Sequence, residues 1–142
     1  MKLGLEGKTA IVSAASRGLG RACAESLARE GVDVTIMART ADALEATAQE
    51  IADKTGRRIT PVAGDFNSLD DRARLFDACP KPDILVNNPG VRQTPDPYDE
   101  IDRDTWLQWL NDHFLSSITM IQAVAPGMCE RKFGRIVNMS VS

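Results

Sequence analysis

Short apolar runs alternate with longer segments of helical periodicity along this chain, and this alternation constrains the fold more than any other feature. Each run lacks a regular alternation of polar and apolar residues, as expected when helices cover both faces of a strand. A strand followed by a helix and another strand is typical of βαβ units, which build a parallel sheet. We therefore expect an α/β fold with strands at Thr9–Ser13, Val32–Ala38, Arg58–Ala63, Asp83–Asn87 and Arg135–Met139.

The segments between the expected strands predict helices. The first three are expected at Gly20–Glu30, Ala41–Thr55 and Leu69–Cys79. In the third helix, Leu69, Ala73 and Phe76 are expected to face the core. The longest helix carries an apolar stripe at spacings of three and four, which is typical of a helix packed on a sheet. The stripe consists of Leu107, Leu110, Phe114, Ile118, Ile121, Ala125 and Met128.

Length and composition limit the classes of protein to which the chain can belong. Its 142 residues are the length of one ordinary domain. The formal net charge of -3 and the scattered basic residues give no reason to expect nucleic acid as a partner. Cys23, Cys79 and Cys129 are far apart, which favours a reducing cytoplasm over a disulfide framework or a metal site. No apolar run reaches the roughly 18 residues of a membrane span, so we expect no membrane association.

The segment SAASRGLG, residues 13–20, connects the first expected strand to the first helix. Such a turn directs unpaired backbone N–H groups and the positive end of the helix dipole at one point, which favours a bound phosphate. Gly18 and Gly20 allow the backbone to approach a ligand closely, whereas Ala14 stands where a nucleotide-binding turn usually has glycine. We expect a negative φ at Ala14. Because no Gly-Lys-Ser/Thr follows the glycines, an NTPase is poorly supported.

The spacing A-x-x-x-G-x-G from Ala14, together with LVNNPG at residues 85–90, resembles the T-G-x-x-x-G-x-G and N-N-A-G signatures of the short-chain dehydrogenase/reductase family. The resemblance continues through APGM to FGRIVNMS, and its SAASRG and NMSVS segments resemble a branch labelled 3-oxoacyl-acyl-carrier-protein-reductase-like. It implies a Rossmann-type doubly wound parallel sheet with strand order 3-2-1-4-5. It also implies that residues 1–142 are a single NADP-binding domain, the N-terminal part of a longer domain, in a homo-oligomer.

The residues after the second expected strand predict the type of cofactor. An acidic residue there binds the ribose 2′-hydroxyl of NAD, and an arginine binds the 2′-phosphate of NADP. Ala38 stands in the acidic position and Arg39 follows it, which favours NADP. The alternative is that Arg39 is a solvated arginine at a strand end. Ser16 and Arg17 can add a hydroxyl and a guanidinium to the bound anion.

The resemblance also assigns roles to residues after the third and fourth strands. Asp65 matches an aspartate that contacts the adenine amino group, with Phe66 as its neighbour. Asn87 matches an asparagine that braces the central strands beside the ribose, and Pro89 replaces the usual alanine. The residues expected to bind the cofactor are Ser13, Ser16, Arg17, Gly18, Leu19, Gly20, Arg39, Asp65, Phe66, Asn87 and Gly90.

The acid/base pair of the family has no counterpart in this chain. In the family, the tyrosine of Y-x-x-x-K serves as acid/base, and its lysine lowers the pKa of the tyrosine. The single tyrosine here, Tyr98, is followed four residues later by Asp102 and precedes the last expected helix. The chain stops at Ser142, before the position of that motif. These residues alone are therefore expected to bind cofactor weakly and to be inactive.

The serine and asparagine positions of the family are altered as well. The serine that orients the substrate carbonyl falls on Val141, between Ser140 and Ser142. The helix asparagine that anchors a proton-relay water falls on His113. Ser140, Ser142 and His113 are therefore the catalytic candidates. For His113 the alternative is an ordinary packed or surface histidine.

Two functions are consistent with these features. The main hypothesis is a cytoplasmic NADP-dependent oxidoreductase that moves a hydride between NADPH and a small-molecule carbonyl or alcohol. Its tyrosine and lysine would come from residues outside this chain. The alternative is a non-catalytic NADP-binding sensor or regulator, and a tyrosine and lysine four residues apart beyond Ser142 would favour the enzyme. We expect no metal.

Overall fold

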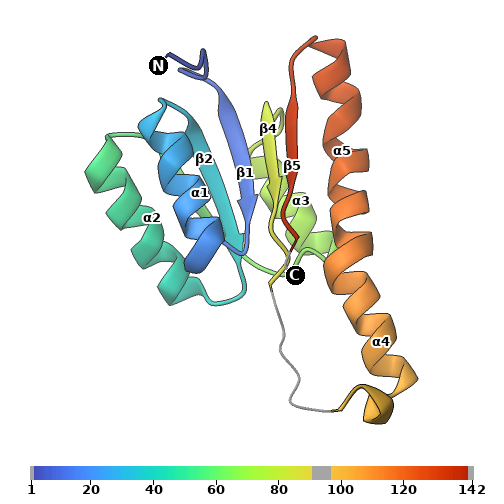
Figure 1. Ribbon diagram of the computed structural model, residues 1–142. Coiled ribbons are helices and arrows are strands. Elements are labelled where there is room, and N and C mark those ends of the chain that lie inside the picture. Colours follow the sequence, from blue (N-terminus) through green and yellow to red (C-terminus); the bar gives the residue numbers. More distant parts are fainter. Residues whose placement is uncertain (1, 91–96, 141–142) are drawn as a thin grey trace.

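A parallel sheet of five strands lies at the centre of the computed structural model, which describes residues 2–90 and 97–140 (Figure 1). The strand order β3-β2-β1-β4-β5 confirms the predicted doubly wound arrangement. Each expected strand is present, and each boundary lies within a residue of its predicted position. The strands are β1 (Thr9–Ser13), β2 (Asp33–Ala38), β3 (Ile59–Ala63), β4 (Ile84–Asn87) and β5 (Arg135–Asn138).

The helices follow the strands in the expected order. The first begins at Gly18 rather than Gly20, and Gly31 and Gly56 after the first two helices have φ values of 86° and 68°. Such left-handed conformations favour glycine at the end of a helix. The helical elements are α1 (Gly18–Arg29), α2 (Ala41–Thr55), α3 (Leu69–Ala78), the short 3-10 helix Tyr98–Glu100, α4 (Arg103–Leu110), the π turn Asn111–Leu115 and α5 (Ser116–Glu130).

Side chains of β1 point alternately into two separate cores. Ala10 and Val12 join the core that α1 and α2 cover, whereas Ile11 joins the core that α3 and α5 cover. All three are fully buried. Burial on both faces explains why this strand is a continuous apolar run in the sequence.

The face that α3 buries differs from the prediction. Leu75 is fully buried and Phe76 packs partly against the core, but Leu69 is 74% exposed and Ala73 is also exposed. Leu69 is the first residue of the helix, where Ser68 caps it by accepting from the N–H of Asp71 at 3.3 Å. The buried face of α3 is therefore marked by Leu75 and not by Leu69 and Ala73, so the apolar spacing indicated the wrong face.

The apolar stripe of the last helix is also only partly buried. Of the expected residues Met128 is buried, whereas Leu107 and Phe114 are 44% and 59% exposed. The other residues of α5 that pack on the sheet, Met120 and Val124, were not part of the predicted stripe. The π turn inserts an extra residue into the helical path, which rotates the residues before it relative to those after it. In addition, α4 extends past the ends of the strands (Figure 1), so no part of the sheet covers it.

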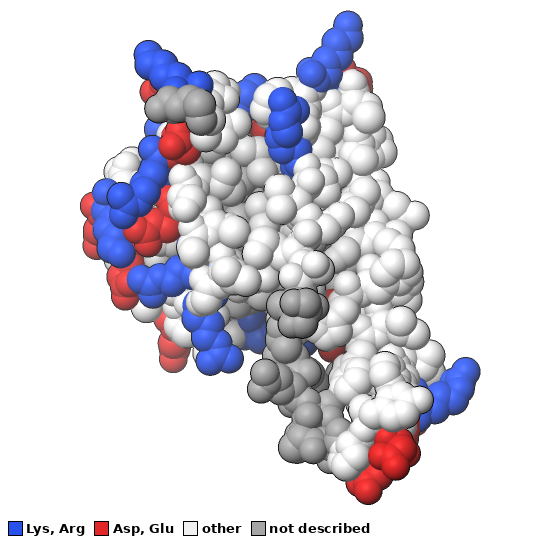
Figure 2. Space-filling model, in the orientation of Figure 1, with Lys and Arg blue, Asp and Glu red and all other residues white. Residues whose placement is uncertain are grey.

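Charged side chains are unevenly distributed over the surface. On the face shown they lie over α1 and α2 and at the two ends of the molecule, whereas the middle of the surface over β5 and α5 is largely uncharged (Figure 2). Within that surface, Ile136 and Val137 of β5 are 36% and 47% exposed. Of the helices described, none is both long enough and apolar enough to cross a membrane.

The expected negative φ at Ala14 is wrong, because its φ is 47°. Hydrogen bonds on either side hold this conformation. The N–H of Ala15 donates to the carbonyl of Met37 at 3.3 Å, and Nδ2 of Asn88 donates to the carbonyl of Ala14 at 3.4 Å. The chain therefore turns in the left-handed region at Ala14, where a Cβ atom is strained.

Ala14→Gly is expected to stabilise the fold by about 0.5–1 kcal/mol, because relief of left-handed strain exceeds the added flexibility of the unfolded chain. Thermal unfolding followed by circular dichroism measures the change. Ala15→Gly is the matched control, since Ala15 is fully buried and outside the positive-φ region. It should destabilise the protein. A lower melting temperature for Ala14→Gly than for the wild type would contradict the assigned conformation.

Candidate functional site

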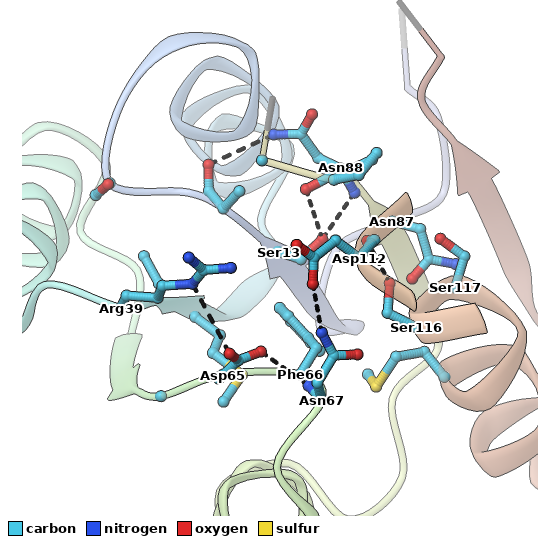
Figure 3. Close-up of a pocket in the computed structure, with 18 of the residues that line it drawn as sticks. Ser13, Arg39, Asp65, Phe66, Asn67, Asn87, Asn88, Asp112, Ser116 and Ser117 are labelled. Carbon is cyan, nitrogen blue, oxygen red and sulfur yellow. Dashed lines mark hydrogen bonds and ion pairs between the residues drawn. The ribbon is translucent and has the colours of Figure 1, made fainter. Parts of the chain in front are cut away.

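A cavity of about 780 Å³ lies at the carboxyl ends of the central strands (Figure 3). Ser13 ends β1, Ala38 ends β2, Gly64 follows β3 and Asn87 ends β4, and all four line the cavity. The π turn and the start of α5 form the remaining wall. Ligands of open parallel sheets bind at this edge, where loops follow the strands.

The glycine turn presents backbone donors to the cavity. Arg17 is the N-cap of α1, and its guanidinium has no acceptor that could satisfy the N–H groups of the first turn. Gly20 is buried against the carbonyl of Ala14, so the turn is tightly closed. The Thr47 hydroxyl donates to the carbonyl of Ser16 at 2.7 Å, which ties this turn to α2. The N–H groups and the helix dipole together suit an anion.

Polar side chains at the ends of β1 and β4 hold the two adjacent loops together. The Ser13 hydroxyl is buried and accepts from the N–H of Asn88 at 2.7 Å. Asn87 Nδ2 donates to Asn138 Oδ1 at 2.9 Å, which links β4 to β5. Ser13 therefore braces the site in addition to lining it, and Asn87 links β4 to β5 at the edge of the described sheet.

An acidic wall follows β3. The N–H of Asp65 donates to Asp71 Oδ2 at 2.9 Å, so the start of α3 fixes the backbone of this turn. Arg72 donates to the carbonyl of Phe66 at 2.5 Å. On the other side, Arg39 Nε lies 3.9 Å from Asp65 Oδ2. Both side chains of that pair are about half exposed, 53% and 44%, so solvent screens their attraction.

Asp71→Asn is expected to reduce the loss of stability in acid. The hydrogen bond from the N–H of Asp65, and then that from Arg74, lower the pKa of the Asp71 carboxyl. A carboxyl with a lowered folded-state pKa stabilises the protein above its unfolded-state pKa, and this contribution disappears as the pH falls through the folded-state value.

The wild type should therefore lose stability below about pH 4, and the variant should lose less. Thermal unfolding midpoints at about pH 7 and about pH 3 measure this difference. Asp70→Asn is the matched control, because Asp70 is exposed and next along the chain. Equal acid dependence in wild type and Asp71→Asn would rule out the proposed contribution.

Most of the expected cofactor-binding residues lie at the cavity. Gly18 and Gly20 shape the turn but are not among the lining residues. The expected residues that line it are Ser13, Ser16, Arg17, Leu19, Arg39, Asp65, Phe66, Asn87 and Gly90.

The catalytic candidates are not brought together. His113 lies on the π turn, and Ser140 is exposed after β5, but neither lines the cavity. Ser142 lies outside the described residues. Within the described residues, no cluster of three or more His, Cys, Asp or Glu could hold a metal ion.

Several residues that line the cavity were not predicted from the sequence. Asn88 belongs to the visible NNPG motif, so its position beside Asn87 was a usable signal. Asp112 precedes His113, but only the π turn directs it into the cavity, and no sequence pattern indicated that turn. The other missed polar residues are Thr40, Asn67, Ser116 and Ser117.

Comparison with known proteins shows that the chain is similar in sequence to oxidoreductases. The family described as short chain dehydrogenase matches residues 8–142. The "Uncharacterized oxidoreductase YvaG" of Bacillus subtilis (strain 168) is 35% identical over 138 residues, covering 96% of this chain and 52% of that protein. The "Inactive hydroxysteroid dehydrogenase-like protein 1" of Homo sapiens is 34% identical over 140 residues, covering 94% and 42%. The chain thus spans about half the length of these curated relatives.

Solved structures share the fold. L-sorbose reductase from Gluconobacter frateurii, complexed with NADPH and L-sorbose, has a TM-score of 0.89 at 28% identity, covering 97% of this chain and 54% of that chain. A 3-oxoacyl-[acyl-carrier protein] reductase from Brucella melitensis with bound NAD has a TM-score of 0.87 at 26% identity, covering 95% and 53%. Both kinds of nicotinamide cofactor therefore occur among the structural neighbours.

Proposed function

This chain belongs to the short-chain dehydrogenase family, and we propose that it forms the cofactor-binding part of an NADP-dependent oxidoreductase. In this proposal, residues 1–142 are a single Rossmann-type NADP-binding domain within a longer protein. The enzyme moves a hydride between NADPH and a small-molecule carbonyl or alcohol in the cytoplasm. The observation that carries the proposal is the cavity, where the donors of the glycine turn and two arginines meet at one sheet edge.

The phosphate groups of the cofactor are assigned to residues around the glycine turn. The diphosphate binds the first-turn N–H groups of α1, with Ser16 and Arg17 as additional donors. Arg39 binds the 2′-phosphate, because Ala38 leaves no carboxylate at the end of β2 to repel it. A Cβ at Gly20 would lie 2.4 Å from the Ala14 carbonyl oxygen, so this closed turn requires glycine. Such a turn suits a backbone that lies directly against a ligand.

The base and the riboses are assigned to the ends of β3 and β4. Asp65 accepts from the adenine amino group, and Phe66 lies beside the base. Asn87 and Gly90 lie near the ribose region. When bound, the nicotinamide supplies or receives the hydride. The role of this chain is to orient the ring and the substrate beside it.

Two residues, chosen from three candidates, are proposed to act on the substrate. Ser140 or Ser142 donates a hydrogen bond that polarises the substrate carbonyl, since both flank the serine position of the family. His113, at the asparagine position, carries protons towards the reacting oxygen. The tyrosine and lysine of the acid/base pair come from outside these residues. The protein is therefore inactive without them.

The exposed apolar residues on and next to α4 support a homo-oligomer. Trp106 and Trp109 form an edge-to-face pair with centroids 5.0 Å apart, and Trp106 is 41% exposed. Contiguous apolar surface of this kind is typical of a protein–protein interface. A second copy of the chain packing on α4 would cover it.

A non-catalytic NADP-binding module is the second candidate. His113 and Pro89 replace residues that the family pattern has as asparagine and alanine, and one relative carries the name "Inactive". Reduction or oxidation of any carbonyl or alcohol substrate by the full-length protein with NADPH or NADP would exclude this candidate.

A fluorescence titration of the protein with NADPH and with NADH tests the main proposal. We expect NADPH to bind more tightly than NADH, since only NADPH carries the 2′-phosphate. Equal affinity for the two nucleotides would contradict the assignment of Arg39. The absence of binding to either would contradict the proposed function as a whole.

A further inference from the structure

Asn67 donates hydrogen bonds to two carboxylates that line the cavity (Figure 3). Its backbone N–H donates to Asp65 Oδ1 at 2.9 Å. Its side-chain Nδ2 donates to Asp112 Oδ1 at 2.6 Å, across 45 positions of sequence. Asp65 comes from the end of β3 and Asp112 from the π turn. One asparagine thus fixes two acidic side chains that come from separate elements.

In each carboxylate the second oxygen accepts no hydrogen bond from the described residues. Asp65 Oδ2 is 3.9 Å from Arg39 Nε, which is beyond hydrogen-bond distance. Asp112 Oδ2 is buried and, among residues 2–90 and 97–140, has no hydrogen-bond partner. Leaving a buried carboxylate oxygen without a donor is unfavourable. The position of Asp112 at the cavity therefore points to a donor that a bound molecule supplies.

The residues around Asp112 indicate which kind of molecule would supply the donor. Asp65 and Asp112 accept hydrogen bonds, and the aromatic ring of Phe66 lines the cavity beside them. A flat ring with an amino group matches both properties, because the ring packs against Phe66 and the amino group has two N–H donors. A carbonyl oxygen at the same ring position would instead face two carboxylates and be repelled.

We propose that Asp112 is a specificity-determining residue for the base of the cofactor. Together with Asp65 it accepts from the two N–H groups of the adenine amino group. This inference rests on the proposed function, which places NADP in the cavity. The inference adds a second carboxylate that contacts the adenine base. It also assigns to Asn67 the role of positioning both carboxylates.

The test compares NADPH with its analogue in which hypoxanthine replaces adenine. Fluorescence titration gives the dissociation constant of each, and their ratio isolates the base, because the loss of a carboxylate affects the phosphate groups of both nucleotides equally. The wild type should prefer NADPH by at least about tenfold. Asp112→Ala should reduce this preference to about threefold or less, mainly by weakening NADPH.

Two further variants complete the experiment. Asn67→Ala should also reduce the preference, since it removes the side-chain donor to Asp112 and leaves the backbone donor to Asp65 in place. Asp104→Ala is the matched control: it removes an acidic residue from the first turn of α4 that does not line the cavity, and it should keep the wild-type ratio. Circular dichroism establishes that each variant is folded. Asn67→Ala also tests the inference if Asp112→Ala does not fold.

The outcomes separate the inference from the proposed function. If the wild type prefers NADPH over NADH but folded Asp112→Ala keeps the wild-type preference for adenine, the role of Asp112 is wrong and the proposed function stands. If the wild type does not discriminate between adenine and hypoxanthine, the inference is also wrong. If neither NADPH nor its analogue binds, the proposed function fails and the inference fails with it.

Discussion

Gly20→Ala is expected to lower the free energy of unfolding by about 2–4 kcal/mol and to abolish NADPH binding. A Cβ at this position would lie 2.4 Å from the carbonyl oxygen of Ala14 and 2.8 Å from Asn88 Nδ2. The side chain of Asn88 can move, but the carbonyl belongs to the backbone of a turn that already has a φ of 47°. The helix must therefore shift away from the turn, which displaces the N–H groups proposed to bind the diphosphate.

Gly18→Ala is the matched control for this prediction. Gly18 has a φ of 60°, but a Cβ added there would meet no atom within 4 Å beyond its chain neighbours, so the cost is left-handed strain alone, about 1–2 kcal/mol. Urea unfolding followed by circular dichroism compares the two variants with the wild type. If Gly20→Ala is no less stable than Gly18→Ala, the close contact with the Ala14 carbonyl is not present in solution.

Burial on both faces of the sheet made the architecture predictable. The strands β1 and β4 are buried along almost their whole length, and their uninterrupted apolar runs appear directly in the sequence. Leu44, Ala48 and Ile51 repeat at helical spacing because α2 packs on the sheet along its length, and all three are buried. In these elements local pattern and tertiary packing agree, so the pattern was sufficient.

The errors arose where packing at the end of an element decides the outcome. Leu69 has helical spacing with Phe76, but it lies at the first position of α3 and is exposed. The φ of Ala14 depends on hydrogen bonds from Asn88 and to Met37, which are distant in sequence. Neither the exposure of Leu69 nor the hydrogen bonds around Ala14 produce a recognisable pattern in the neighbouring sequence.

The candidate site was predictable only in part, for the same reason. Residues in motifs, such as Arg39 and Asp65, lie at the cavity because strand ends meet at one edge of a parallel sheet. Asp112 reaches the cavity through the π turn, and its partner Asn67 is 45 residues away in sequence. Helical periodicity assumes a regular helix, so it could not indicate a side chain that an irregular turn redirects.

Arg39→Ala is expected to weaken NADPH binding about 10- to 100-fold and to change NADH binding by no more than about twofold. Charge-assisted hydrogen bonds from a guanidinium to a phosphate account for the loss, and NADH has no 2′-phosphate to lose them. The guanidinium is available for this role, since its 3.9 Å contact with Asp65 is long and half exposed. Parallel fluorescence titrations with the two nucleotides measure the ratio of dissociation constants.

Two further substitutions show whether the loss comes from the phosphate contact. Arg39→Lys keeps the charge but loses the two-pronged geometry, so its NADPH affinity should fall between wild type and Arg39→Ala. Arg29→Ala removes an arginine of α1 that pairs with Glu25 and does not line the cavity, so it should bind both nucleotides as the wild type does. An equal loss for NADPH and NADH in Arg39→Ala would assign this arginine to a part common to both cofactors. The preference for NADP would then have to come from another cation, and among residues 2–90 and 97–140 the other arginine that lines the cavity is Arg17.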